Sequence, residues 1–229
     1  MDGPKLKNAL VLFSKAPIAG MVKTRLQPCI SPEKSACLQE AFIKDSILKM
    51  RKIDYVDRFL YFQPEERKYL FEKLIGGLPI HLYCQKGLDL GKKMENAFRD
   101  LFNKGFSRVV IIGVDSPTLP EKYINKAFTE LNTSDLAIGP AVDGGYYLIG
   151  LKEKLSPVFS SVEWGSDKVL LQTENLIKKH DIKLSLLPVH YDIDTVDDLH
   201  FLKAHLQILS RSGEYIPVNT MRVIEQILS

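Results

Sequence analysis

Short apolar runs alternate with helical segments along this chain, and this alternation restricts its fold more than any other feature. We predict strands at 8–13, 56–62, 79–83, 109–114, 135–138, 146–151 and 183–188. Helices are predicted from 32, from 64, at 90–103, 120–131 and 167–179, and in the segment after 195. Strands separated by helices of this length need crossover connections, so the pattern predicts a mainly parallel sheet with helices on both faces.

The composition fits one compact domain. With 229 residues, of which 45% are hydrophobic and 26% charged, the chain can bury a sizeable core. We therefore expect a single three-layer α/β/α domain over residues 1–229, built on a mainly parallel mixed sheet. Residues 210–229, a loop and a short helix ending at Ser229, are expected to form an accessory segment.

Charge and cysteine content argue against several classes of protein. The net charge is only +3, which does not indicate a nucleic-acid-binding protein. The three cysteines lack CxxC spacing, so neither a disulfide framework nor a structural zinc site is indicated. The apolar run from Ala9 to Phe13 is too short for a membrane span or a signal-peptide core, and we expect a cytoplasmic protein.

A cationic loop follows the first predicted strand. The segment SKAPIAGMVKTRL, residues 14–26, carries Lys15, Lys23 and Arg25 together with Gly20. Glycine permits a positive φ, so backbone amides as well as these cations could face a polyphosphate. A solvated cationic loop is the structural alternative, but its place after the first strand of an α/β sheet favours phosphate binding.

Two aspartates follow strand-like segments that are far apart in the sequence. Asp115 comes after the apolar run 109–114, and Asp194 lies in the block DIDTVDDL, residues 192–199. Carboxylate oxygens are ligands that Mg²⁺ or Mn²⁺ prefers, so this pair is a candidate cation site. The alternative for Asp115 is a turn residue. In the second block, Thr195 predicts a helix N-cap, which explains Asp197 and Asp198 without a function but does not explain Asp194 as directly.

The glycine-rich block GPAVDGGYYLIGL, residues 139–151, has two compatible interpretations. Asp143 could orient an acceptor hydroxyl, with Gly144 and Gly145 leaving room for the ligand. Asp-Gly before an apolar strand is also a strong hairpin signal.

The single tryptophan, Trp164, lies in VEWGSDKVLLQT, residues 162–173, just before a predicted helix. Core packing is the favoured interpretation, and a wall of the acceptor pocket is the alternative.

These blocks occur in the order of a known family. KAPIAGMVKTRL, GLDLGKKM, GVDSPTLP, GPAVDGGYYLIGL and DIDTVDDL together cover roughly residues 8–204. The chain resembles the nucleotide-diphospho-sugar transferase (GT-A-like) superfamily. Within it, the chain looks like the small glycosyltransferases associated with arsenosugar biosynthesis, which are similar to 2-phospho-lactate guanylyltransferase. Two departures from the pattern are Lys93, where arginine is expected, and Ser166, where threonine is usual.

The resemblance implies roles for individual residues. The nucleotide phosphates would be lined by Lys15, Lys23, Thr24 and Arg25. Segment 85–91, including Gln85 and Gly87, would border the nucleotide, and Asp115 and Asp194 would hold the metal. Catalysis would then depend on Asp115, Arg25 and Lys23, which neutralise the departing phosphates.

Three functions are compatible with such a site. The first is metal-dependent transfer of a sugar from a nucleotide sugar to a small-molecule acceptor, with Mg²⁺ or Mn²⁺ as cofactor. The second is nucleotidyl transfer from a nucleoside triphosphate to a phosphorylated small molecule, with release of pyrophosphate. The third is a non-catalytic nucleotide sensor, which the presence of both Asp115 and Asp194 disfavours.

Overall fold

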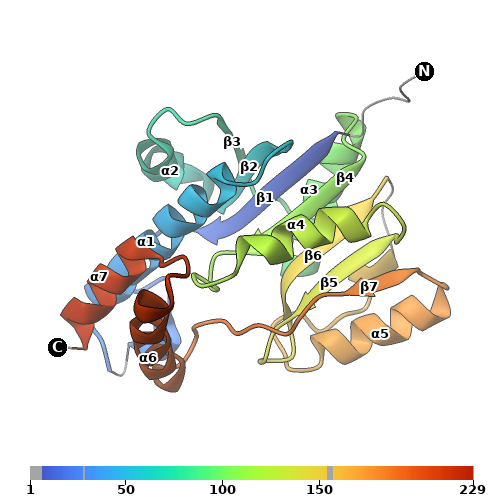
Figure 1. The fold of residues 1–229 in the computed structure, drawn as a ribbon. Coiled ribbons are helices and arrows are strands. Elements are labelled where there is room, and N and C mark those ends of the chain that lie inside the picture. The colour runs from blue at the N-terminus through green and yellow to red at the C-terminus, as the bar shows by residue number, and fades with distance from the viewer. Residues whose placement is uncertain (1–6, 28, 154–156, 229) are drawn as a thin grey trace.

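A twisted sheet of seven strands forms the middle layer of the molecule (Figure 1). The computed structural model describes residues 7–27, 29–153 and 157–228. The spatial order of the strands is β3-β2-β1-β4-β6-β5-β7. Their bounds are Asn8–Lys15 (β1), Asp57–Gln63 (β2), Ile80–Cys84 (β3), Arg108–Gly113 (β4), Leu136–Pro140 (β5), Tyr146–Lys152 (β6) and Leu184–Leu186 (β7). Strand β6 runs antiparallel to both of its neighbours, whereas all other pairs are parallel.

Helices cover both faces of this sheet. Their bounds are Pro32–Arg51 (α1), Lys68–Ile75 (α2), Leu90–Asn103 (α3), Glu121–Glu130 (α4), Val169–Lys179 (α5), Val196–Ser212 (α6) and Val218–Ile227 (α7). Short 3-10 helices span Thr24–Leu26 (η1), Glu65–Arg67 (η2) and Pro157–Phe159 (η3). Among the described residues, no helix is long and apolar enough to cross a membrane.

Each sheet face has its own apolar core, because alternate side chains of a strand point to opposite faces. In β1, Leu10 and Leu12 join the core under α1, α4, α6 and α7. Ala9, Val11 and Phe13 join the opposite core, which contains residues of α3 and η3. All of these β1 side chains are buried, as the continuous apolar run at 8–13 predicts for a central parallel strand.

The predicted three-layer architecture is therefore confirmed, and the differences are local. The helix predicted from 64 begins as η2 and continues as α2. The Asp-Gly signal in the glycine-rich block does form a hairpin, which joins β5 to β6. The predicted C-terminal helix is α7, which packs against α1; Ser229, its predicted end, lies outside the described residues.

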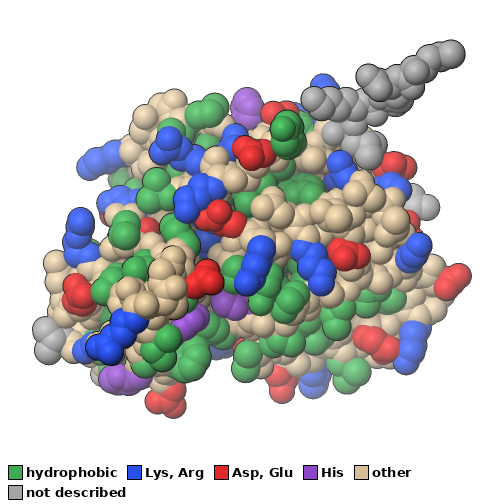
Figure 2. All heavy atoms as spheres, viewed as in Figure 1, with side chains coloured by type: hydrophobic (Ala, Val, Ile, Leu, Met, Phe, Trp, Pro, Cys, Tyr) green, Lys and Arg blue, Asp and Glu red, His purple; other side chains and the backbone are tan. Residues whose placement is uncertain are grey.

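The visible face of the molecule carries a mixture of charges. In Figure 2, acidic and basic side chains are interspersed over the face formed by α1 and α4, with apolar side chains between them. No single sign of charge dominates this face, as expected from a net charge of +3.

Buried charges on α1 hold two other segments in place. Lys49 is 1% exposed, and its Nζ donates to the carbonyl oxygens of Pro117 at 3.0 Å and Ser116 at 3.5 Å, directly after Asp115. One turn earlier, the buried Asp45 accepts hydrogen bonds from the backbone N–H groups of residues 219 and 220. A carboxylate at the start of α7 also suits the dipole of that helix.

The charge on Lys49 is costly in this environment. Burial lowers the pKa of its ammonium group to about 7, although the nearby Asp45 and Glu121 carboxylates act in the opposite direction. Lys52 adds a repulsive charge, and the charge of Lys49 in turn lowers the pKa of His190. Since lysine is ordinarily protonated up to about pH 10, folding at neutral pH either desolvates this charge or releases its proton.

We therefore expect Lys49 to make stability increase with pH. Between pH 7 and 10 the unfolded chain holds a proton at Lys49 that the folded chain tends to release. The free energy of unfolding then rises with pH by up to about 1.4 kcal/mol per pH unit. Urea unfolding at pH 7, 8 and 9 should show this increment in the parent chain and in the control Lys34→Met, which is exposed on α1, but not in Lys49→Met. If the free energy of unfolding rose equally with pH in the parent and in Lys49→Met, Lys49 would not be the source of the pH dependence.

Candidate functional site

The carboxyl ends of β1, β2, β3 and β4 lie at one rim of the sheet, where α/β proteins bind ligands. The cationic loop leaves β1 at this rim, and Asp115 follows β4 two residues after Gly113. Segment 187–195, which connects β7 to α6, passes the same rim, because Ile193 N–H donates to the Asp115 carbonyl at 3.0 Å. Three distant parts of the sequence therefore meet at one place.

Lys23 is the residue that joins them. Its Nζ forms an ion pair with Asp115, lies 3.3 Å from Asp194 Oδ1 and donates to the carbonyl of Ile193. The side chain is 3% exposed, and its ammonium group stands 5.4 Å from the ring centroid of Phe42 on α1. Its backbone adopts the left-handed conformation at φ 48°, immediately before η1.

The electrostatics of Lys23 follow from these contacts. Burial alone would lower the pKa of its ammonium group, but the Asp115 and Asp194 carboxylates outweigh burial and raise that pKa above its ordinary value. A lysine has three N–H donors, and these three protein acceptors use all of them. In this geometry Lys23 has no donor left for a phosphate, although the family resemblance implies that it lines the phosphates.

Three carboxylates cluster beside this ion pair. Asp143, Asp192 and Asp194 each offer an oxygen atom within 4.8 Å of the others. Burial raises the pKa of Asp192 to about 7, and repulsion from Asp143 and Asp194 adds to the effect. Burial is thus the main cause of the raised pKa of Asp192, and repulsion between the three carboxylates is the second.

The donor set fits a hard divalent cation. Asp115 is joined to Asp194 of the cluster through Lys23, and among the described residues the cations that form ion pairs with these two aspartates are Lys23 and Arg25. The carboxylates outnumber these two cations, and carboxylate oxygens are the ligands that Mg²⁺ and Mn²⁺ prefer. Sequence reasoning paired Asp115 with Asp194, whereas the structure groups Asp194 with Asp143 and Asp192, and its ion pairs place Lys23 between Asp194 and Asp115.

The other two cations of the loop are more exposed than Lys23. Arg25 is 68% exposed, and its guanidinium lies 3.6 Å from Asp194 Oδ2. Thr24 is exposed at the start of η1. Lys15, the last residue of β1, is exposed and lines a pocket on the other side of the loop. Arg25 and Lys15 are therefore free to meet an anionic ligand, which Lys23 is not.

The glycine-rich block forms the hairpin that carries Asp143. The Oδ1 of Asp143 accepts from Gly145 N–H at 2.9 Å, which fixes the turn. Gly144 has φ +89°, and a Cβ there would lie 2.3 Å from the backbone oxygen of Asp167. The space beside Gly144 is thus filled by the protein's own backbone.

Trp164 packs against α3 and β6. A Cβ at Gly91 would lie 2.1 Å from Trp164 Nε1, so the indole rests directly on this glycine of the GLDLGKKM block. The ring also meets Tyr146 edge-on at 6.0 Å between centroids, and it borders the core on the α3 face. These contacts are those of a half-buried packing residue.

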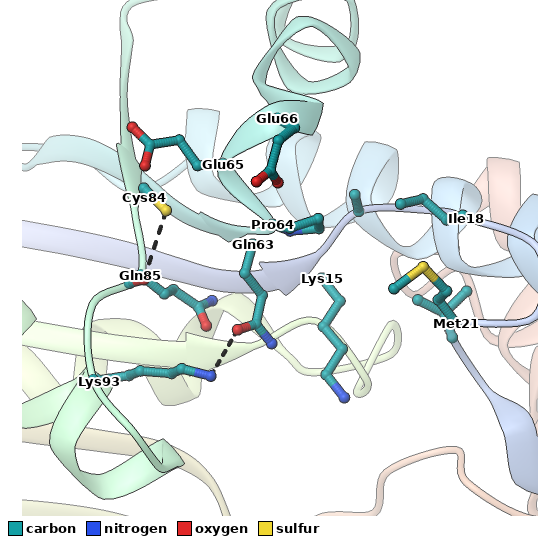
Figure 3. Close-up of a pocket in the computed structure, with 13 residues that line it drawn as sticks. Lys15, Ile18, Met21, Gln63, Pro64, Glu65, Glu66, Cys84, Gln85 and Lys93 are labelled. Carbon is teal, nitrogen blue, oxygen red and sulfur yellow. Dashed lines mark hydrogen bonds between the residues drawn. The ribbon is translucent and has the colours of Figure 1, made fainter.

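A pocket of about 490 Å³ lies on the other side of the cationic loop (Figure 3). One wall is formed by the loop itself, through Ala16, Ile18, Met21 and Val22. The remaining lining residues are Lys15, Gln63, Pro64, Glu65, Glu66, Cys84, Gln85, Gly87 and Lys93. Its size suits a nucleotide or a similar small ligand. Since Lys23 directly follows Val22, a single loop separates the pocket from the carboxylate cluster.

Sequence reasoning found part of this site. Gln85 and Gly87, which the resemblance places beside the nucleotide, do line the pocket. Gln63 was missed because a glutamine at the end of a strand carries no motif, and Lys93 was noted only as a departure from the family. Asp192 was also missed, although its i, i+2 spacing from Asp194 in an extended segment is a usable signal.

Solved structures share this fold over nearly the whole chain. A candidate nucleotide-diphospho-sugar transferase from Desulfovibrio desulfuricans has 31% sequence identity and a TM-score of 0.85, covering 97% of this chain and 99% of that chain. The 4-diphosphocytidyl-2C-methyl-D-erythritol synthase of Anaerococcus prevotii has a TM-score of 0.59 and 12% sequence identity, covering 87% of this chain and 96% of that chain. A cytidylyltransferase from Leptospira borgpetersenii has a TM-score of 0.59 and 12% sequence identity, covering 97% of this chain and 95% of that chain. The two latter likenesses concern the fold alone.

One family model also matches the sequence. It is described as "Uncharacterized protein conserved in bacteria (DUF2064)" and matches residues 47–166, slightly more than half of the chain. No protein of curated function matches the sequence. The matched segment contains β4 and Asp115 as well as Gln63, Gln85 and Lys93, so it includes much of the pocket and the central strand. This chain belongs to the DUF2064 family, and its fold is that of the nucleotide-diphospho-sugar transferases.

Proposed function

We propose that this chain is a metal-dependent glycosyltransferase, which moves a sugar from a nucleotide sugar to a small-molecule acceptor. One observation carries the proposal: a nucleotide-sized pocket is separated by a single cationic loop from a cluster of three carboxylates that could hold a divalent cation. A nucleotide in the pocket could extend its phosphates across the loop toward the cluster. The similarity to a candidate nucleotide-diphospho-sugar transferase supports this choice of donor.

Individual residues of the chain would have distinct roles in this reaction. Lys15 and Arg25 are exposed on the two sides of the loop and would contact the phosphates. Asp192, Asp194 and Asp143 would hold Mg²⁺ or Mn²⁺, with Asp115 beside them. Bound there, the cation would neutralise the leaving diphosphate.

Lys23 would hold Asp115 and Asp194 at the separation the site needs. The acceptor would approach on the side of Asp143 and its hairpin, where the Gly145 N–H donates to the Asp143 carboxylate.

Nucleotidyl transfer is the second candidate, because cytidylyltransferases share the fold. The two reactions break different bonds. In sugar transfer, the bond between the sugar's anomeric carbon and the diphosphate oxygen breaks, the acceptor oxygen bonds to that carbon and loses its proton, and a nucleoside diphosphate leaves. In nucleotidyl transfer, an acceptor phosphate oxygen attacks the α-phosphorus of a triphosphate, and pyrophosphate leaves.

The cation site is tested by Asp192→Asn. This change removes one ligand charge without breaking any of the ion pairs described above, so we expect affinity for Mn²⁺ in the presence of nucleotide to fall about tenfold or more. Calorimetric titration would measure the fall, and circular dichroism would confirm an intact fold. Asp197→Asn, in the exposed first turn of α6, is the matched control. Equal Mn²⁺ affinity in Asp192→Asn and the parent would remove Asp192 from the site.

The phosphate contact is tested by Arg25→Ala. Loss of a charge-assisted hydrogen bond should weaken nucleotide binding by about 1.5 to 3 kcal/mol, which is roughly 10- to 150-fold. Arg211→Ala, which removes an exposed arginine near the end of α6, should leave nucleotide affinity unchanged. An Arg25→Ala chain that binds nucleotide as tightly as the parent would show that this arginine is only a solvated side chain.

The products distinguish the two reactions. We expect nucleoside diphosphate when the protein is incubated with Mg²⁺ or Mn²⁺, pooled nucleotide donors and small acceptors. Pyrophosphate that disappears in Asp194→Ala would establish nucleotidyl transfer instead. Absence of both products, combined with tight nucleotide binding that ignores the metal, would favour the nucleotide sensor.

A further inference from the structure

The three carboxylates of the cluster are held in place in different ways. Asp143 accepts a hydrogen bond from the Gly145 N–H at 2.9 Å, and Asp194 is ion-paired with Lys23. Among the described residues, no other residue donates a hydrogen bond to the Asp192 carboxylate or forms an ion pair with it. The place of this carboxylate is therefore set by the backbone that carries it.

The backbone is fixed on both sides of Asp192 but not at it. On one side, the N–H of His190 donates to the last residue of β5 at 3.0 Å. On the other side, the N–H of Ile193 donates to the Asp115 carbonyl at 3.0 Å. Within the described parts of the chain, no backbone hydrogen bond joins residues 191 and 192 to another residue. Between these two points the segment depends on a side chain for its position.

Tyr191 supplies that side chain. Its hydroxyl oxygen accepts a hydrogen bond from Thr118 Oγ1 at 2.8 Å and lies 2.6 Å from His205 Nδ1. A phenol has a single proton, so with Thr118 as the donor this proton goes to the histidine nitrogen. Thr118 belongs to the loop after β4, and His205 belongs to α6. One hydroxyl group thus ties segment 187–195 to two other elements.

The other partner in this contact is itself firmly placed. Thr118 is 7% exposed, and Lys49 Nζ donates to the carbonyl oxygen of Pro117, directly before it, at 3.0 Å. The hydroxyl of Tyr191 is therefore bonded to a buried loop that a buried lysine holds. Because Asp192 directly follows Tyr191, a fixed tyrosine restricts where that carboxylate can lie.

We infer that Tyr191 is a positioning residue for the cation site. Its hydrogen bond with Thr118 holds Asp192 where its carboxylate meets those of Asp143 and Asp194. Tyr191 acts through Asp192 alone. The inference rests on the proposed function, because it takes the carboxylate cluster to be the cation site.

The test is a titration with Mn²⁺ alone, in which free Mn²⁺ is counted from its electron paramagnetic resonance signal. Tyr191→Phe keeps the ring and removes the hydroxyl group. We expect its affinity for Mn²⁺ to fall about tenfold, the lower end of what loss of a group that orients a metal ligand costs. In the Asp192→Asn chain the same change should have no further effect, because Tyr191 acts through Asp192. An equal fall in both chains would overturn the inference, since Tyr191 would then support the region in general.

Changes at the other end of the hydrogen bond complete the test. Thr118→Val should reproduce the loss of Mn²⁺ affinity, whereas Thr118→Ser, which keeps a hydroxyl group, should retain the affinity of the parent. Tyr215→Phe is the matched control, because it removes a buried tyrosine hydroxyl that has no hydrogen-bond partner among the described residues. Circular dichroism and urea unfolding would confirm that each variant is folded under the conditions of the titration.

The outcomes separate the positioning role from the cation site itself. If Tyr191→Phe binds Mn²⁺ as tightly as the parent, the positioning role is wrong and the cation site stands. If the parent binds no Mn²⁺, the cation site of the proposed function is wrong, and the positioning role with it.

Discussion

The contact between the Lys23 ammonium group and its three acceptors organises the whole rim of the sheet. Asp115 follows the central strand β4, Asp194 and the Ile193 carbonyl belong to the segment before α6, and Lys23 comes from the loop after β1. A buried charge is tolerated only when it is paired and hydrogen-bonded. The three segments must therefore assemble together, and their assembly sets the places of both the pocket and the carboxylate cluster.

Buried charges on helix α1 are hydrogen-bonded in the same way, outside the site itself. Lys49 hydrogen-bonds the loop after Asp115, and Asp45 accepts hydrogen bonds from the start of α7, so that α1 supports both segments through buried charges. Lys23 gains two carboxylate partners, whereas the contacts of Lys49 are with carbonyl oxygens. This difference explains why the pKa of Lys23 is raised and that of Lys49 is lowered.

The fold was largely predictable, because its determinants are local. The apolar runs 9–13 in β1 and 109–112 in β4 are buried, and their continuous hydrophobicity reflects helices on both faces of the sheet. Proline at the start of α1 and Asp-Gly in the β5–β6 hairpin are signals that depend on backbone geometry within a few residues. The antiparallel direction of β6 follows from that hairpin, since a short turn cannot join parallel strands.

By itself, the sequence determined the layered architecture, the cationic loop and the two candidate aspartates, Asp115 after a predicted strand and Asp194 before a predicted helix, because residue type and spacing along the chain decide these features. Only the tertiary structure decided which side chains contact one another. It bound Lys23 to Asp115 and Asp194, placed Asp192 and Asp143 beside Asp194, and brought Gln63 to Lys93 in the pocket. Apart from the neighbours Asp192 and Asp194, these residues are distant in sequence, and their contacts depend on the order of the strands in the sheet, which no local pattern contains.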